Sequence, residues 1–451
     1  STQTEAKDSK DGIFTENDKH LGLWFPILTG LSGIVGHSHI DVRTAALRAL
    51  SNVLQSYGHM FNKSFWELMF RGVLLPIFDN VSYAGGTDLF KEDNEWLTTT
   101  CLLAFNSLIE LYTGFFDRIS FLLNDLLNLL TNCILQENES LARIGATCFL
   151  QLVMQNGGKL TEDMWSTICN RLALILEKNT PNELLKSDGQ ALEVFLVQNI
   201  GSSASVSQVR SPHLKSSPSS EQLDANGEPT DNNNPNSPRS HRQKIPLTAA
   251  MVSKIIRGKS TVQLGLIEAL NEIAFTLYHH LSTGHLLILL DSLESCYKFT
   301  FEANHNVLYR SKIEKAGLVD LLLREETTAV SSYLRVLFRM YAETTKDAEN
   351  RSKIAEEKLF NKIKEIVGDF VHRTVEKDKN KSESKRILGA YAGIIVQILK
   401  GIHDMYEPQI KAHTEFLYPL LCDLISSDSK EVRNTLKKVF VKFGQIQGIT
   451  K

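Results

Sequence analysis

The segment Gly258-Lys259-Ser260 has the residue types of a phosphate-binding loop, in which backbone amides cradle a phosphate group and the lysine contacts it. That pattern also needs a glycine five residues before Gly258, where this chain has Ser253. Residues 249–257 have the apolar spacing of a helix rather than the strand that precedes such a loop. We therefore interpret this segment as part of a helix and predict no cofactor.

Histidines and cysteines can ligate metals or activate nucleophiles, but their spacing here matches neither use. His37 and His39 lie in a turn between predicted helices, and His279 and His280 end another helix, away from any cysteine cluster or HExxH sequence. The six cysteines include no CxxC pair and lie in apolar helical stretches: Cys101, Cys133, Cys148, Cys169, Cys296 and Cys422. We expect buried, reduced thiols, a cytosolic compartment, no metal site and no catalytic residue.

Three serines that precede prolines, Ser211, Ser217 and Ser237, are candidates for phosphorylation. They lie in residues 199–245, which are rich in Ser, Pro, Asn and Asp and have almost no large apolar side chain, so we predict a disordered linker. Such serines are accessible to proline-directed kinases, and each phosphate would add about two negative charges. The alternative is an inert linker.

Outside this linker, apolar residues are spaced as they are in helices. One pattern, a helix followed by a turn and a second helix, occurs twice in the sequence. In residues 41–57, apolar side chains recur every three or four positions, and Gly58 follows. Trp66 lies eight residues beyond Gly58, and Trp165 lies eight residues beyond Gly157. Each copy therefore predicts a helix, a glycine turn and a second helix, with the tryptophan in the core.

Arg43 and Arg143 lie near the start of these two copies, and Arg433 marks a third, partial copy. The sequence Asp41-Val42-Arg43 is similar to the start of a HEAT repeat, in which Asp and Arg pair between adjacent repeats. We predict that the three arginines form a structural ladder, and the alternative is that they contact a partner. Trp24 is predicted to lie in the core, with an exposed interface anchor as its alternative.

A single hairpin cannot bury its apolar face, whereas stacked hairpins can. The sequence therefore predicts an all-α, HEAT/armadillo-like α-solenoid of stacked helical hairpins, interrupted by a disordered loop. We divide it into a flexible segment 1–19, a HEAT-like block 20–198, the linker 199–245 and a second HEAT-like block 246–448.

The net charge of −3 argues against nucleic-acid binding. No apolar run approaches a membrane span, and the absence of an initiator methionine suggests a fragment of a longer protein.

Several short segments, in order along nearly the whole chain outside the linker, resemble the C-terminal region of the large brefeldin A-inhibited guanine-nucleotide exchange factors for ARF GTPases. They are Leu23-Trp24-Phe25-Pro26-Ile27-Leu28, Trp66-Glu67-Leu68-Met69-Phe70-Arg71, Glu95-Trp96-Leu97-Thr98-Thr99-Thr100-Cys101, Leu141-Ala142-Arg143-Ile144-Gly145, Arg324-Glu325-Glu326-Thr327-Thr328 and Lys411-Ala412-His413-Thr414-Glu415-Phe416-Leu417-Tyr418-Pro419.

The resemblance implies a helical region downstream of the catalytic exchange domain, to which no segment here is similar. The family uses such regions for dimerisation, autoinhibition and recruitment by small GTPases at Golgi membranes. We therefore expect a non-catalytic scaffold or regulatory region that binds ARF, ARF-like or Rab GTPases. Homodimerisation, indirect association with Golgi membranes and a location in the cytosol and on the trans-Golgi network are further expectations. The alternative is a free-standing HEAT-repeat adaptor in membrane traffic without exchange activity.

Overall fold

The computed structural model describes residues 21–78, 97–182, 249–306, 309, 313–314, 317–343, 349–375 and 381–449. Helices make up most of these residues, and no strand occurs among them, so the predicted all-α fold is confirmed. The predicted segments 1–19 and 199–245, the serines Ser211, Ser217 and Ser237, and Trp96 lie outside the described residues.

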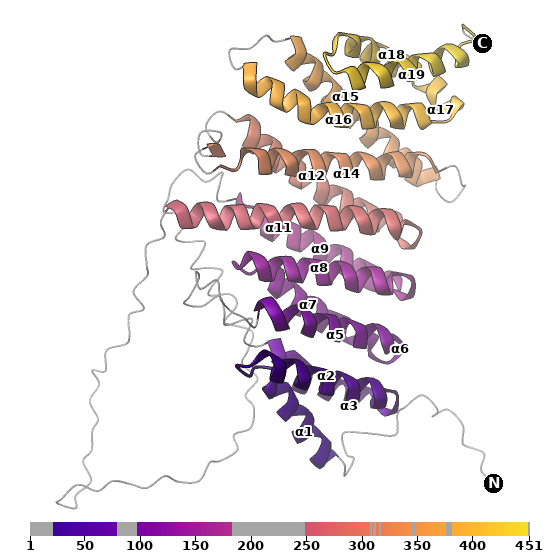
Figure 1. Ribbon diagram of the computed structural model, residues 1–451. Coiled ribbons are helices and arrows are strands. Elements are labelled where there is room, and N and C mark those ends of the chain that lie inside the picture. Colours follow the sequence, from indigo (N-terminus) through magenta and orange to yellow (C-terminus); the bar gives the residue numbers. More distant parts are fainter. Residues whose placement is uncertain are drawn as a thin grey trace, which may run out of the picture. The chain divides into compact units, whose positions relative to one another are not determined.

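The principal helices are shown in Figure 1. In chain order they are α1 (Leu21–Ile34), α2 (Ile40–Tyr57), α3 (Lys63–Met69), η2 (Phe70–Leu74), η3 (Leu75–Phe78), η4 (Leu97–Cys101), α5 (Leu102–Gly114), α6 (Phe116–Ile119), α7 (Leu123–Ile134), α8 (Glu139–Asn156), α9 (Glu162–Asn179), α11 (Ala249–Thr276), α12 (Thr283–His305), α14 (Val319–Tyr341), α15 (Glu349–Val375), α16 (Lys381–Asp404), α17 (Glu407–Ala412), α18 (Thr414–Asp423) and α19 (Lys430–Ile446).

The helices stack in two layers, and each hairpin contributes one helix to each layer (Figure 1). In one layer α2 packs against α5 and α5 against α8, and further along the chain α14 packs against α16 and α16 against α19. In the other layer α7 packs against α9 and α9 against α12, and α15 packs against α18. This arrangement is an α-solenoid of the HEAT/armadillo type, as the sequence predicts.

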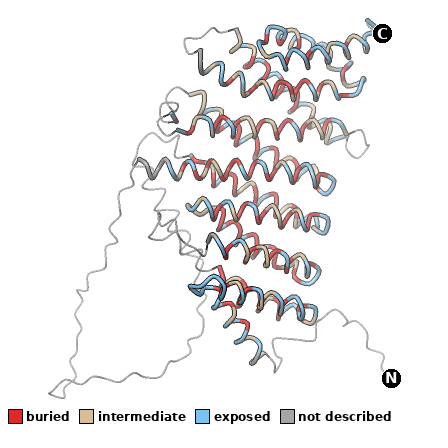
Figure 2. Tube along the Cα trace, viewed as in Figure 1, coloured by how far each residue is buried: buried red, intermediate tan, exposed pale blue. Residues whose placement is uncertain are grey.

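A hydrophobic core lies between the two layers (Figure 2). The described residues up to Asn182 and those from Ile255 onward form one compact unit. Within this unit, buried apolar side chains extend from Leu28 on α1 to Phe443 on α19. The unit contains helices of both predicted HEAT-like blocks, which meet where α9 packs against α12.

The turns between paired helices are built alike in three hairpins. A short 3₁₀ helix comes first, namely η1 (Gly58–Met60), η6 (Gly157–Lys159) or η8 (Tyr278–His280), and one extended residue follows. A side-chain oxygen then accepts a hydrogen bond from the first turn of the next helix, and the capping residues are Asn62, Thr161 and Ser282. The first two turns lie where the sequence predicts glycine turns.

Gly58 is required by the space around it rather than by its backbone conformation. Its φ of −59° is right-handed, so it does not end α2 in the left-handed way that glycine often ends a helix. A Cβ at Gly58 would lie 2.6 Å from Cζ2 of Trp66 and 2.7 Å from Cζ of Phe115. Gly157 is similarly crowded, because its Cβ would lie 2.6 Å from Cδ1 of Leu277. Gly58 thus lets Trp66 pack against the backbone, and Gly157 does the same for Leu277.

We expect Gly58→Ala to lower the free energy of unfolding by about 1–3 kcal/mol, because the added methyl group displaces Trp66 or Phe115. Gly265→Ala is the matched control, since Gly265 is exposed in the middle of α11 with no atom within 4 Å of an added Cβ. The control should raise stability by about 0.5–1 kcal/mol through helix propensity. Urea denaturation measures both, and equal effects of the two alanines would contradict the packing role of Gly58.

Candidate functional site

The segment Gly258-Lys259-Ser260 lies inside the continuous helix α11, as predicted, and has no loop that would cradle a phosphate. Ser260 is fully buried. The carbonyl oxygen of Lys259 accepts a hydrogen bond of 2.9 Å from Nδ2 of Asn179, which also donates to Oε1 of Gln263 at 2.9 Å. These polar groups join α9 to α11, so their role is structural.

The candidate metal ligands do not converge on a site. His37 and His39 contact one another with ring centroids 5.5 Å apart. Across the described part of the chain, no three His, Cys, Asp or Glu side chains are arranged to hold a metal ion. All six cysteines are free thiols, and burial raises the pKa of the Cys101 thiol to about 12, which keeps it protonated and poorly nucleophilic.

Arg43, the first predicted ladder residue, is buried at the start of α2 and joins two neighbouring hairpins. Its Nε donates to Oγ1 of Thr100 at 2.8 Å, and its Nη2 donates to Oγ1 of Thr99 at 3.2 Å, both in η4. Its Nη1 donates to the carbonyl oxygens of His37 and Ser38 in the turn before α2. These bonds of Arg43 to hydroxyl and carbonyl oxygens link the turn before α2 to η4 of the next hairpin.

Arg143 and Arg433 occupy different surroundings. Arg143 is exposed and lies 3.8 Å from Glu139 on its own helix. Arg433 is also exposed, and its Nη1 donates to the carbonyl oxygen of Ser427 in the turn before α19. The structure therefore does not bring the three arginines together, and a common ladder role for them stays a prediction.

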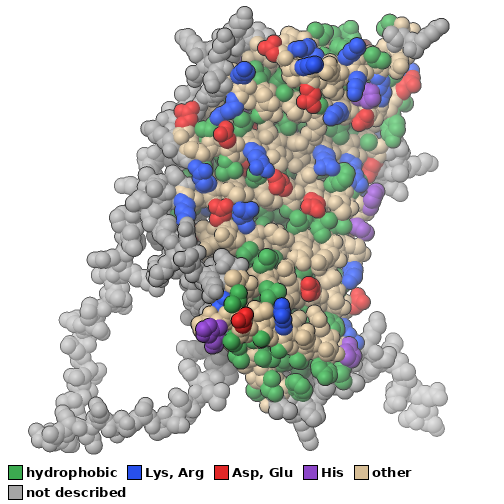
Figure 3. Space-filling model, viewed as in Figure 1, with side chains coloured by type: hydrophobic (Ala, Val, Ile, Leu, Met, Phe, Trp, Pro, Cys, Tyr) green, Lys and Arg blue, Asp and Glu red, His purple; other side chains and the backbone are tan. Residues whose placement is uncertain are grey.

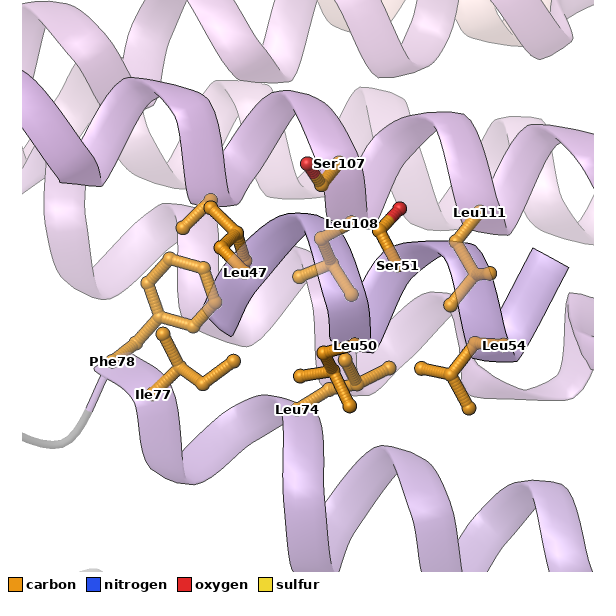
Figure 4. Close-up of a pocket in the computed structure, with 11 residues that line it drawn as sticks. Leu47, Leu50, Ser51, Leu54, Leu74, Ile77, Phe78, Ser107, Leu108 and Leu111 are labelled. Atoms are coloured by element: carbon orange, nitrogen blue, oxygen red, sulfur yellow. The ribbon is translucent and has the colours of Figure 1, made fainter. Parts of the chain in front are cut away.

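A small cavity lies between α2, η3 and α5 (Figure 4). Its volume is about 20 Å³, close to the space that one water molecule needs. The lining is aliphatic and aromatic except for the hydroxyl groups of Ser51 and Ser107. It contains no group that exchanges protons near neutral pH, so it offers neither the size nor the chemistry of a substrate pocket.

Two adjacent glutamates on α14 form the principal buried acidic cluster. Glu325 and Glu326 are both fully buried. Oε1 of Glu326 accepts a hydrogen bond from the Tyr391 hydroxyl on α16, and its Oε2 accepts one of 2.6 Å from Nδ2 of Asn304 on α12. Neither carboxyl oxygen of Glu325 has a hydrogen-bond partner among the described residues.

Burial raises the pKa of the Glu326 carboxyl to about 7, although the bonds from Tyr391 and Asn304 and the charge of Arg373 oppose this rise. Burial also raises the pKa of Glu325 well above its ordinary value. Both carboxyl groups are closed off from solvent, and the hydrogen bonds of Glu326 join α14 to α12 and α16. The sequence segment Arg324-Glu325-Glu326 carried part of the family resemblance but no assigned role. The spacing of residues in the sequence indicates the burial of Glu326, because Glu326 lies on the same face of α14 as Leu322, Ala329 and Tyr333.

An exposed apolar surface covers α1 and the neighbouring side of α2. We call it the α1–α2 patch, and its exposed members are Trp24, Ile27, Ile34, Ile40, Val42 and Tyr57. Trp24 is 39 % exposed, so its predicted core position is wrong and the alternative of an interface position fits. Its ring lies 6.2 Å from that of Tyr57. Helix α1 has no charged residue, and Figure 3 shows apolar side chains gathered at this end of the stack. Such a patch is typical of a protein interface.

The fold defines a class of protein, the α-solenoid of the HEAT type. Comparison with known proteins then identifies its relatives. Residues 261–441 match the model of the BIG2 C-terminal domain family. The chain is 28 % identical to brefeldin A-inhibited guanine nucleotide-exchange protein 1 of Rattus norvegicus and 29 % identical to that of Homo sapiens, over 93 % and 94 % of its length.

A yeast relative is more distant: the ADP-ribosylation factor guanine nucleotide-exchange factor SEC7 of Saccharomyces cerevisiae is 27 % identical over 75 % of this chain. The chain spans about a quarter of the length of the mammalian relatives it matches, 24 % in each case. It is therefore homologous to the C-terminal region of the large brefeldin A-inhibited ARF exchange factors, which confirms the predicted resemblance. No helix among the described residues is both long and apolar enough to span a bilayer.

Proposed function

We propose that the chain is a non-catalytic regulatory arm of a large ARF exchange factor and that its α1–α2 patch binds a small GTPase of the ARF, ARF-like or Rab type. The relatives are named as exchange factors for ADP-ribosylation factor, which supports a GTPase as the partner. Binding of a membrane-anchored GTPase would recruit the parent protein to trans-Golgi membranes. The adaptor alternative would use the same patch and differs in having no exchange domain elsewhere in the polypeptide.

The exposure of Trp24 beside Tyr57 carries this proposal. Both rings belong to neighbouring helices, lie 6.2 Å apart, and are 39 % and 47 % exposed in a patch surrounded by exposed isoleucines. Aromatic anchors near the centre of an apolar patch account for much of the binding energy in protein interfaces. A patch of this kind also suits self-association or an autoinhibitory contact, so the test must distinguish among these partners.

The test is a pulldown of the chain against purified ARF, ARF-like and Rab GTPases, each loaded with GDP or a GTP analogue. We expect one GTPase to be retained in a nucleotide-dependent manner, and Trp24→Ala and Tyr57→Ala each to weaken that binding by about tenfold or more. Phe275→Ala is the matched control, because Phe275 is 47 % exposed on α11, away from the patch.

Two outcomes would contradict the proposal. Background retention of every GTPase in both nucleotide states would remove the recruitment role. A concentration-dependent dimer in analytical ultracentrifugation that Trp24→Ala disperses, without any GTPase binding, would assign the patch to self-association instead.

A further inference from the structure

The outer face of α19 is strongly basic, although the whole chain has a net charge of −3. Helix α19 contains five basic residues and one acidic residue, Glu431. Four of the basic residues are exposed on the side of the helix that faces away from the core, and we call them the α19 basic face: Lys430, Arg433, Lys437 and Lys438. The buried side of the same helix presents Val432, Leu436, Val439 and Phe443 to the core.

The lysines of the α19 basic face are not used in the fold. Within the described residues, no carboxylate oxygen lies within salt-bridge distance of the ammonium groups of Lys430, Lys437 or Lys438. Lys442 on the same helix shows the contrast, because its Nζ donates to the carbonyl oxygens of His403 and Met405 and so fastens α19 to the end of α16. Side chains without a structural role are available to a partner.

Exposed apolar side chains accompany these charges. Val441 is 46 % exposed and follows Lys437 and Lys438 by one helical turn on the same face. Tyr418 on α18 is 51 % exposed and packs edge-on against Phe440 of α19, with ring centroids 6.0 Å apart. Ile449, just beyond the helix, is also exposed. A cluster of exposed lysines is attracted to the negative surface of a membrane that contains anionic lipid, and the exposed apolar side chains beside it can enter the headgroup region.

We propose that the α19 basic face docks directly on a bilayer that contains anionic phospholipid, with Tyr418 and Val441 reaching the headgroup region. Lysine supports this partner, because its ammonium is a flexible point charge that needs no fixed geometry, whereas carboxylate recognition by a folded protein favours the planar fork of arginine. The direct contact is additional to GTPase-dependent recruitment through the α1–α2 patch and does not require it. Figure 3 shows Lys and Arg side chains gathered at the C-terminal end of the stack, at the opposite end from the apolar patch.

The test is sedimentation of the chain, without any GTPase, with vesicles of phosphatidylcholine alone or with added phosphatidylserine. We expect binding only to the anionic vesicles and loss of that binding when the salt concentration rises from about 0.1 M to about 0.5 M. Lys430→Gln, Lys437→Gln and Lys438→Gln should each weaken binding by about fivefold, and the triple variant by roughly a hundredfold.

The matched control is the triple variant Arg48→Gln, Lys178→Gln and Lys364→Gln, which makes the same charge change at exposed positions of α2, α9 and α15. It should leave vesicle binding unchanged, and both triple variants should keep the unfolding midpoint of the parent chain. A free acidic polypeptide, polyglutamate, is included as a competing partner.

Three outcomes would overturn the proposal: equal binding to neutral and anionic vesicles, equal loss in both triple variants, and binding to polyglutamate without binding to vesicles. The last would assign the face to an acidic protein. None of these outcomes affects GTPase retention by the α1–α2 patch, so failure of this proposal and failure of the recruitment proposal can be told apart.

Discussion

Trp66→Ala is expected to lower the free energy of unfolding by about 3–5 kcal/mol, because Trp66 is 0 % exposed at the centre of the first hairpin. Its indole contacts the rings of Phe61 and Phe115, with centroids 5.2 Å and 5.1 Å away. The alanine would leave a cavity between α3 and α6 that the crowded turn at Gly58 cannot fill. Trp165→Ala should have a similar effect, since Trp165 is 1 % exposed in the hairpin of α8 and α9. Urea denaturation followed by circular dichroism measures both losses.

The two tryptophans differ in one hydrogen bond, so phenylalanine variants at the two positions measure what that bond contributes to stability. Nε1 of Trp66 donates to the carbonyl oxygen of Gly58 at 3.1 Å, whereas Nε1 of Trp165 has no acceptor among the described residues. Replacement by phenylalanine removes the N–H in both cases, so Trp66→Phe should cost about 1 kcal/mol more than Trp165→Phe. Unchanged unfolding of both alanine variants would contradict the repeat register itself.

The predictable part of the fold is the part that repeats. The spacing of apolar residues and the glycine–tryptophan pairs at Gly58 and Gly157 predicted helical hairpins, because a hairpin must present the same apolar stripe each time it stacks. The third turn, at Tyr278–His280, lies where the sequence predicts the end of a helix, but it was not recognised as a copy of the repeat, because Leu286 occupies the position of the tryptophan and only Ser282 repeats the cap. Its capping geometry is conserved in the structure although its residue types are not.

Features that depend on contacts between distant segments were not predictable. Arg43 carries the same sequence signal as Arg143, yet one is buried against Thr100 and the other is exposed, because only the first faces the start of the next hairpin. Trp24 looked like a core residue, since an apolar helix normally lies inside a protein. Its exposure follows from the position of α1 at the end of the stack, where one side of the helix has no neighbouring hairpin among the described residues.

The buried glutamates predict an unusual dependence of stability on pH. An unfolded chain releases the proton of Glu326 near its ordinary pKa of 4.5, whereas burial raises the pKa in the folded chain to about 7. Between these values the folded state holds a proton that the unfolded state has lost. The contribution of Glu326 to the free energy of unfolding is therefore complete below about pH 4.5 and is lost as the pH rises to about 7. The loss is about 3 kcal/mol for this group. Glu325 contributes in the same direction.

Glu326→Gln should remove the contribution of Glu326, because the amide keeps the shape of the side chain and cannot ionise. We expect the difference in unfolding free energy between the variant and the parent chain to shift by about 3 kcal/mol in favour of the variant between pH 4.5 and pH 7.5. Urea denaturation at several pH values measures this difference, in which the titration of all other groups cancels.

Glu294→Gln provides the opposite case. Burial alone would raise the pKa of Glu294, but ion pairs with Lys298 and Lys362 outweigh it and lower the pKa below its ordinary value. Its contribution to stability is present above the ordinary pKa and is lost as the pH falls, so this variant should lose stability at pH 7 and little at low pH. The unfolding free energy of Glu326→Gln, relative to the parent chain, could instead change with pH in the same direction as that of Glu294→Gln. This result would show that the Glu326 carboxyl is ionised in the folded chain. The packing of α12, α14 and α16 would then tolerate a buried charge next to Tyr391 and Asn304.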